Sequence, residues 1–157
     1  MKKIQLLVLL CFVFPHVFGC VKTSQHGVVV VTGTVTVEGQ PMEGIDMIFH
    51  PVAGEIAAFG STNAQGKYKL SSPSTPVGAG AMEGEYVATF TKTTVESRPP
   101  ASKMEERRYR GIDGTSRVPV ITHHIPEKYG DRTTCGIAPV KVEKGKTNVF
   151  DFDLSTK

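Results

Sequence analysis

Hydrophobic and polar residues alternate with a period of two over much of the chain from Gly27 onward, a pattern typical of half-buried β-strands. In the first such segment Val29, Val31, Val35 and Val37 share one parity, and threonines occupy the positions between them. We therefore predict a strand at 29–37 with one buried and one exposed face.

The same alternation predicts further strands, separated by turns that contain glycine, proline or asparagine. Asn63-Ala64-Gln65-Gly66 is typical of a hairpin turn that ends in glycine. The last strand places Asp151 and Asp153 on its exposed side, opposite three apolar residues. The predicted strands after the first cover 44–50, 56–62, 67–70, 84–94, 137–142 and 147–154.

Seven short strands with frequent turn signals predict an all-β fold, an antiparallel β-sandwich that closes with a hairpin around 143–146. A long excursion from 95 to 134 precedes this hairpin. Within it, Ser102 and Glu105 match a helix capping box, residues 104–110 suit about two helical turns, and Gly111 suits a helix end. Such a long excursion in a small domain is usually functional or poorly ordered.

Several segments of the chain resemble carboxypeptidase regulatory-like domains. The resemblance implies a transthyretin-like or Ig-like sandwich that is generally non-catalytic, as in small lipoproteins of planctomycete bacteria. It covers about 31–154, and the segments that carry it are 33–37 with 39–45, 62–68, 84–88, and the tail from 125–130 to 151–154.

The first twenty residues have a basic start, an apolar run and a final cysteine. Lys2 and Lys3 precede the almost wholly apolar stretch 4–14, and Val17-Phe18-Gly19-Cys20 follows it. An apolar run of about ten residues is typical of a signal peptide and too short to span a bilayer of roughly 30 Å. The ending resembles a bacterial lipobox, whose cysteine is lipidated and becomes the new N-terminus. Ordinary secretion, with cleavage near Gly19, is the alternative.

Charge gives little information about a partner. The chain has 18 Lys and Arg against 15 Asp and Glu, and two of the lysines lie in the leader, which is the predicted signal peptide at 1–19. The remainder is close to neutral and has no long basic run, so nucleic acid is not an expected partner.

The cysteines agree with an exported protein that has no internal disulfide. Cys11 leaves with the leader and Cys20 would carry lipid, so that Cys135 is left alone. A leftover cysteine is either a buried small hydrophobe or a reactive thiol, and here burial is expected because no activating base lies nearby in the sequence.

Candidate chemistry concentrates in the excursion. His123 and His124, with Tyr109 and Tyr129, invite comparison with the two-His, two-Tyr iron site of intradiol dioxygenases, which also contain a transthyretin-like fold. The order of these residues differs from that family, however, and adjacent residues in an extended chain point to opposite sides. Tyr109-Arg110-Gly111 echoes a signature of hydroxyisourate hydrolases, but lies in mid-chain and is followed by isoleucine.

One further carboxylate pair could help to hold Ca²⁺ if other oxygen ligands converged on it. Asp151 and Asp153 lie two residues apart on one strand face, although a solvated face is the commoner arrangement. We therefore predict no catalytic residue, no metal and no cofactor.

These observations divide the chain into a lipoprotein signal peptide at 1–19, a tether at 20–26 and a carboxypeptidase regulatory-like β-sandwich domain at 27–157. We expect a non-enzymatic structural or interaction module of the cell envelope. Acyl chains such as palmitate on Cys20 would hold it in the outer membrane or at the cell surface.

Two alternatives remain open. The first is a carbohydrate- or peptide-binding module that uses residues 95–134, with an envelope protein or a glycan as its partner. Its tyrosines would stack on the ligand and its arginines would form hydrogen bonds; these residues are Tyr109, Tyr129, Arg107, Arg108 and Arg110. The second is a metal-dependent enzyme that uses His123 and His124. The candidate ligand-binding side chains are Tyr109, Arg110, His123, His124 and Tyr129.

Overall fold

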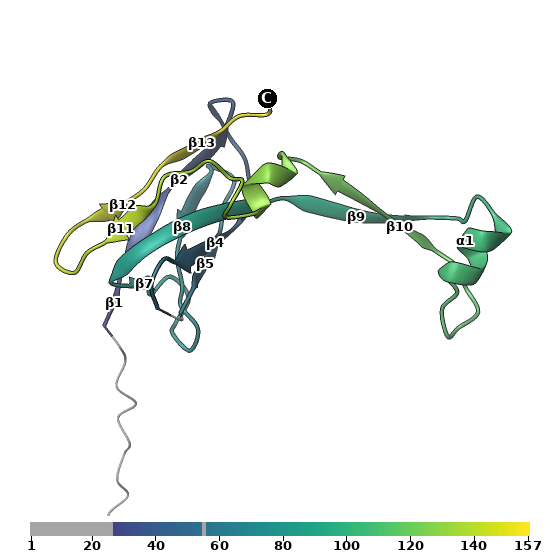
Figure 1. The fold of residues 1–157 in the computed structure, drawn as a ribbon, viewed down its shortest axis with the longest axis horizontal. Coiled ribbons are helices and arrows are strands. Elements are labelled where there is room, and N and C mark those ends of the chain that lie inside the picture. The colour runs from purple at the N-terminus through teal and green to yellow at the C-terminus, as the bar shows by residue number, and fades with distance from the viewer. Residues whose placement is uncertain (1–26, 55) are drawn as a thin grey trace, which may run out of the picture.

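The computed structural model describes residues 27–54 and 56–157; the predicted signal peptide, the tether and Cys20 lie outside them. The described chain is an all-β sandwich with one short α-helix, which confirms the predicted fold class. Two sheets pack together in the body, and a long two-stranded arm leaves it on one side (Figure 1).

The first sheet has four antiparallel strands in the order β11-β8-β4-β5. Met47 and Phe49 of β4 are buried, whereas Asp46 and Ile48, which alternate with them, are exposed, as the alternation predicts. The strands are β4 (Asp46–Pro51), β5 (Ala58–Ser61), β8 (Gly84–Thr91) and β11 (Val140–Val142).

The second sheet is built around β2 (Val31–Val37), whose odd-numbered residues are all buried. On one side of β2 lie two antiparallel partners, β3 (Gln40–Pro41) and β6 (Lys67–Lys69). On the other side β12 (Asn148–Val149) and β13 (Phe152–Leu154) run parallel to it, an exception to the antiparallel pairing that we predicted. A small separate pair joins β1 (Val28–Val29) to β7 (Ala81–Met82).

The predicted closing hairpin is wrong, because its two strands belong to different sheets. β11 pairs with β8, whereas β12 and β13 pair with β2. The Asn148 side chain holds the connection between them: it accepts a hydrogen bond from the Glu143 N–H (2.9 Å) and donates to the carbonyls of Glu143 (3.0 Å) and Lys146 (3.1 Å). The hydrogen bonds of this buried side-chain amide take the place of the cross-strand backbone hydrogen bonds that a hairpin would have. The chain crosses here from one sheet to the other.

Aromatic side chains fill the space between the sheets. Phe49 lies at the centre, with ring centroids 6.1 to 6.4 Å from those of four neighbours: Tyr68, Tyr86, Phe150 and Phe152. The buried core cluster includes no residue between Phe90 and Ile125. The body is therefore packed without any contribution from the arm.

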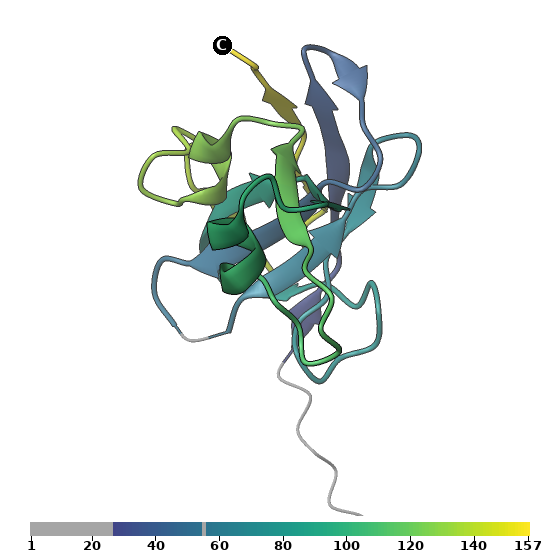
Figure 2. The ribbon, with the colours of Figure 1, turned by 90° about the vertical axis from the view of Figure 1, so that its right-hand side faces the viewer.

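The predicted excursion 95–134 contains more regular structure than expected. Only Lys92 separates β8 from β9 (Thr93–Arg98), which pairs with β10 (Val118–His123) to form the arm, defined here as residues 93–123. The arm ends in α1 (Lys103–Arg108), two residues shorter at its C-terminal end than predicted. Figure 2 looks along the arm toward the body.

After the arm, the chain forms the 3-10 turn η1 (Glu127–Gly130), which packs against β8. Among residues 27–54 and 56–157 there is no helix of the length and apolar character needed to cross a membrane.

Candidate functional site

The arm is a two-stranded ribbon whose residues are exposed on both faces. Every residue of β9 and all but one of β10 lie at the surface, the exception being Val118. Val95 lies opposite Ile121, and the two side chains are 66% and 58% exposed. The arm therefore presents an apolar cross-strand pair to solvent.

The composition of the two strands explains why they pair. Both contain β-branched residues, which favour extended backbone. Pro119 lacks an N–H but is tolerated because β10 is an edge strand. At the base of the arm, the His124 N–H donates to the Lys92 carbonyl (2.9 Å) and extends the ladder by one further hydrogen bond.

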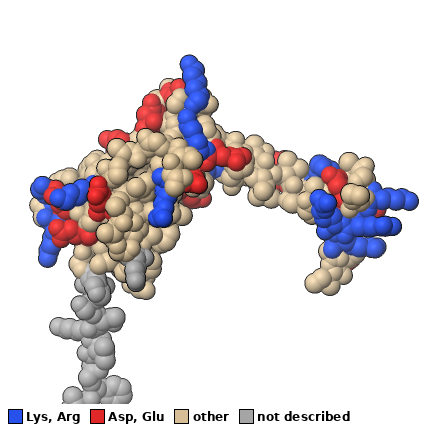
Figure 3. All heavy atoms as spheres, in the orientation of Figure 1, with Lys and Arg blue, Asp and Glu red and all other residues tan. Residues whose placement is uncertain are grey.

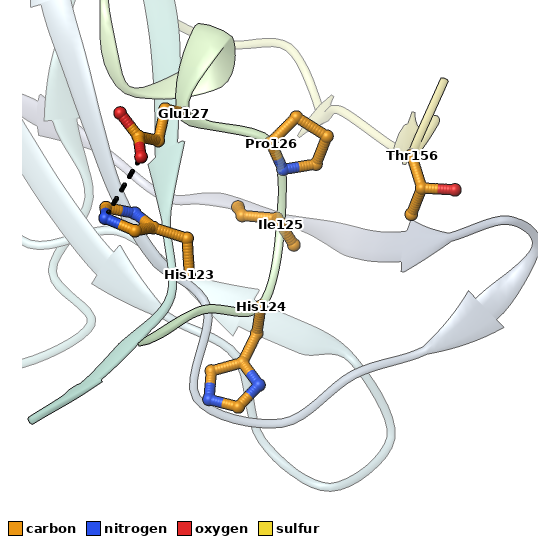
Figure 4. A pocket seen from close by; sticks show the side chains of 6 residues that line it. All are labelled: His123, His124, Ile125, Pro126, Glu127 and Thr156. Atoms are coloured by element: carbon orange, nitrogen blue, oxygen red, sulfur yellow. Dashed lines mark ion pairs between the residues drawn. The ribbon is translucent and has the colours of Figure 1, made fainter. Parts of the chain in front are cut away.

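The base of the arm holds the two candidate histidines. Figure 4 shows their imidazoles pointing in different directions. His123 Nε2 lies 3.3 Å from Glu127 Oε1, and His124 Nε2 lies 3.0 Å from Thr94 Oγ1. The histidines border an open hollow of about 360 Å³ that also touches Ile125, Pro126 and Thr156. The divergence agrees with the prediction that adjacent extended residues do not converge on one ligand.

Tyr129 is not among the residues that line this hollow, and it has a structural role. Its ring is buried in the core cluster. Its hydroxyl accepts a hydrogen bond from the Ser155 N–H (2.9 Å) and donates to the Ser155 carbonyl (3.2 Å). The tyrosine therefore fixes the end of the chain against η1.

The tip of the arm, defined here as residues 98–117, holds the other two candidates, Tyr109 and Arg110. Half of the predicted capping box is present: Ser102 Oγ accepts from the Glu105 N–H (3.2 Å), but the Glu105 carboxylate accepts from the Ala101 N–H rather than from that of Ser102. The Glu105 carboxylate also accepts from both terminal nitrogens of Arg98 (2.9 and 3.1 Å) and from the Ala101 N–H (2.8 Å). The hydrogen bonds from Arg98, and then that from Ala101, lower the pKa of Glu105. This bidentate pair fastens α1 to β9.

The structure thus divides the five candidate residues among three places. His123 and His124 lie at the base of the arm, Tyr109 and Arg110 at its tip, and Tyr129 in the core. The four His and Tyr residues compared with an iron site are not brought together.

Basic side chains gather at the tip. Figure 3 shows lysine and arginine around the end of the arm that carries α1, well away from the body. In the part of the chain that the structure describes, ion pairs within 4.0 Å involve Arg98 but none of the other basic residues of the tip. Those residues are Lys103, Arg107, Arg108, Arg110 and Arg117. Residues 98–117 contain six basic and three acidic residues, so the tip carries a net charge of +3.

Apolar side chains are exposed beside these cations. Ile112 is fully exposed and Met104 is 72% exposed, while Tyr109 is partly covered. Ile112 lies in a turn closed by hydrogen bonds from the Gly111 N–H to the Thr115 carbonyl (2.7 Å) and from the Gly114 N–H to the Gly111 carbonyl (3.0 Å). The turn holds this isoleucine in solvent.

The carboxylates considered for Ca²⁺ are occupied by the protein itself. Asp151 Oδ1 accepts from the Thr34 N–H (2.7 Å), and Asp153 Oδ1 accepts from Thr36 Oγ1 (2.6 Å) and the Gly39 N–H (2.8 Å). The hydrogen bonds from Thr36 and then Gly39 lower the pKa of Asp153. Within residues 27–54 and 56–157, no group of three or more His, Cys, Asp or Glu side chains is arranged to hold a metal ion.

Cys135 is buried, as predicted, with 5% of its surface exposed. Its thiol lies 3.6 Å from the Arg132 carbonyl. The side chain therefore acts as a small hydrophobic residue of the core cluster.

Sequence reasoning did not single out Lys103, Met104, Ile112 or Arg117 among the exposed residues of the tip. A signal for the ribbon was present, because Val118-Pro119-Val120-Ile121-Thr122-His123 is rich in β-branched residues. The position of Ile112 between Gly111 and Asp113-Gly114 is also typical of a turn.

Comparison with known protein families, with curated proteins and with solved structures finds no match for this chain.

Proposed function

We propose that the protein is a membrane-anchored lipoprotein of the cell envelope and a non-enzymatic interaction module that contacts its partner through the arm. The observation that carries this proposal is the ribbon itself, which extends from a body whose core does not include it. An isolated two-stranded hairpin is marginally stable in water. A partner that covers Val95 and Ile121 would remove apolar surface from water and stabilise the extended arm.

The leader supports the membrane anchor. A basic start, an apolar run and a cysteine at position 20 are the features of a bacterial lipoprotein signal. Stable attachment to a membrane takes more than one acyl chain, which lipid modification at such a cysteine would supply. The residue after the cysteine is Val21 rather than aspartate, which by analogy with bacterial sorting suits the outer membrane.

The roles of the polar side chains support an activity other than catalysis. Tyr129, Asp151 and Asp153 each bond to the backbone of a neighbouring segment and hold the fold together. The histidines diverge at an open hollow rather than converging on a reacting atom. A metal-dependent reaction at His123 and His124 receives no support from this geometry.

A peptide-binding role is the second candidate, and the edges of the ribbon favour it. Among the described residues β9 and β10 pair only with each other, so the outer edge of each strand is available to an added strand. In that case an extended segment of an envelope protein would continue the sheet.

Fractionation of cells tests the anchor. Cys20→Ser is expected to move the protein out of the membrane fraction, whereas Cys11→Ser, a matched change within the leader, is expected to leave it there. Continued pelleting of the Cys20→Ser protein with membranes would remove the proposed anchor.

Crosslinking in native envelopes tests the arm. A variant in which an Asn-Gly turn replaces residues 94–122 keeps the Thr93–His123 pair at the base. We expect mild crosslinking to capture a partner with the wild-type protein and not with this variant. An unchanged crosslinking pattern would assign the interaction to the body.

A further inference from the structure

We infer that the tip of the arm binds the surface of an anionic lipid bilayer, with its arginines against the headgroups and Ile112 in the interface. This inference rests on the proposed role of the arm as the contacting part, and it names the partner of the tip. It is independent of lipid modification at Cys20.

The first observation is the charge at the tip. Lys103, Arg107 and Arg110 border a hollow of about 130 Å³ that also includes Glu106. Their spacing of three and four residues places them on one side of α1 and the residues that follow it. Arg108 and Arg117 add further positive charge nearby. Basic residues close to an anionic membrane each strengthen binding appreciably.

The three acidic residues of the tip, Glu105, Glu106 and Asp113, are outnumbered two to one by its basic residues. Glu105 is paired with Arg98, and the Asp113 carboxylate accepts hydrogen bonds from the Thr115 N–H (3.0 Å) and hydroxyl (2.9 Å). Those bonds, first from the Thr115 hydroxyl and then from its N–H, lower the pKa of Asp113. Asp113 therefore stabilises the turn in which the exposed Ile112 lies.

The second observation is the exposed apolar surface among the cations. Ile112 and Met104 are aliphatic and exposed, and Tyr109 has an apolar ring with a polar end. A basic surface with apolar side chains is the composition of segments that lie in a membrane interface. The aliphatic groups enter the boundary of the acyl chains while the guanidinium groups remain with the phosphates.

The same observations disfavour one other occupant. A hydrated anionic glycan would use the cations but would gain little from a fully exposed isoleucine. A bilayer uses both the charge and the apolar groups.

The position of the tip suits contact with a flat surface. α1 and its turn lie at the far end of the ribbon, and the body does not surround them (Figures 1 and 3). The tip can therefore meet a membrane without burial of the body.

Vesicle sedimentation tests the inference. Residues 21–157, which contain the whole described core cluster, are mixed with vesicles of phosphatidylglycerol and phosphatidylcholine (3:7) or of phosphatidylcholine alone. We expect binding to the anionic vesicles only. Raising the salt from 0.1 M to 1 M shortens the screening length from about 10 Å to about 3 Å and should weaken binding at least about tenfold.

Substitutions separate the two contributions. Arg107→Gln with Arg110→Gln should weaken vesicle binding about 30-fold, since each cation near the surface contributes about fivefold. Lys67→Gln with Lys69→Gln, which removes the same charge from exposed positions of β6, should leave binding unchanged. Ile112→Ser should weaken binding about tenfold through the loss of apolar burial.

Several results would overturn the inference. They are equal binding to both kinds of vesicle, wild-type binding by the arginine variant, and an equal loss in the β6 control. An Ile112→Ser protein that binds as tightly as wild type would indicate a purely ionic contact and would also contradict it. If vesicles fail to bind while crosslinking still depends on the arm, the proposed function stands and only the lipid partner is wrong.

Discussion

Gly33 of β2 lies directly against the carbonyl group of Phe150, so that a Cβ atom at position 33 would lie 1.8 Å from the carbonyl oxygen. The same oxygen accepts a hydrogen bond from Tyr68 Oη (2.8 Å), and the Phe150 N–H donates to the Thr32 carbonyl (3.0 Å). The contact falls between the β12 and β13 pairings on β2, where the Asp151 side chain bonds the Thr34 N–H. The absence of a side chain at Gly33 therefore permits the last part of the chain to pack on the sheet.

Gly33→Ala is predicted to destabilise the body by about 3 kcal/mol, because the backbone of β2 or of Phe150 must shift to admit the methyl group. Gly27→Ala is the matched control, since nothing lies within 4 Å of a Cβ at that position. Chemical denaturation measures both free energies of unfolding. Equal values for the two variants would contradict the described packing.

Tyr68→Phe is predicted to cost about 1 kcal/mol at neutral pH through the loss of the hydrogen bond to Phe150. Burial, and to a smaller extent Asp151, raise the pKa of Tyr68. The unfolded chain therefore releases this proton first, and the stability of the wild-type protein falls as the pH rises above about 10.

The variant lacks that ionisable group, so its stability should decline less steeply in the same pH range. Denaturation at pH 9, 10 and 11 measures the two slopes. Burial also raises the pKa of Tyr86, so a smaller decline should persist in the variant. Identical slopes would show that Tyr68 is not buried as described.

Replacement of residues 94–122 by an Asn-Gly turn is predicted to leave the unfolding temperature of the body nearly unchanged, because the core cluster has no member in this range. Thermal unfolding followed by circular dichroism provides the measurement. Collapse of the fold in this variant would mean that the arm is part of the core and not an appendage.

The Cys135 thiol is predicted to react with a thiol reagent only after unfolding, since it is buried in the core cluster. As a control, Lys141→Cys introduces a second thiol at an exposed position of β11. With residues 21–157, which lack Cys11 and Cys20, the control protein should show one fast-reacting thiol, and the protein without the substitution none. Fast reaction of the unsubstituted protein would contradict burial.

Much of the fold follows from alternation along single strands. The buried valines of β2 and the pair Met47 and Phe49 lie on the predicted faces, because a strand with one buried face must repeat every two residues. The closing hairpin could not be predicted in the same way. A turn at 143–146 is compatible with either a hairpin or a crossing between sheets, and the buried Asn148 amide decides between them.

The candidate site was predictable only in part. The Ser102 cap of α1 is a local feature, and the sequence predicts it. The separation of Tyr129 from Tyr109 depends on the direction in which the β9–β10 ribbon leaves the body, which no local pattern encodes. The exposed pair Val95 and Ile121 has the pattern of a buried strand, so its exposure could not be inferred from hydrophobicity.

The most direct test of the proposed anchor is the intact mass of the protein isolated from bacterial membranes. The account predicts a chain that begins at Cys20, without residues 1–19, and carries the added mass of acyl chains on that cysteine. A chain that retains Met1, or one that has lost the leader but bears no lipid, would contradict it.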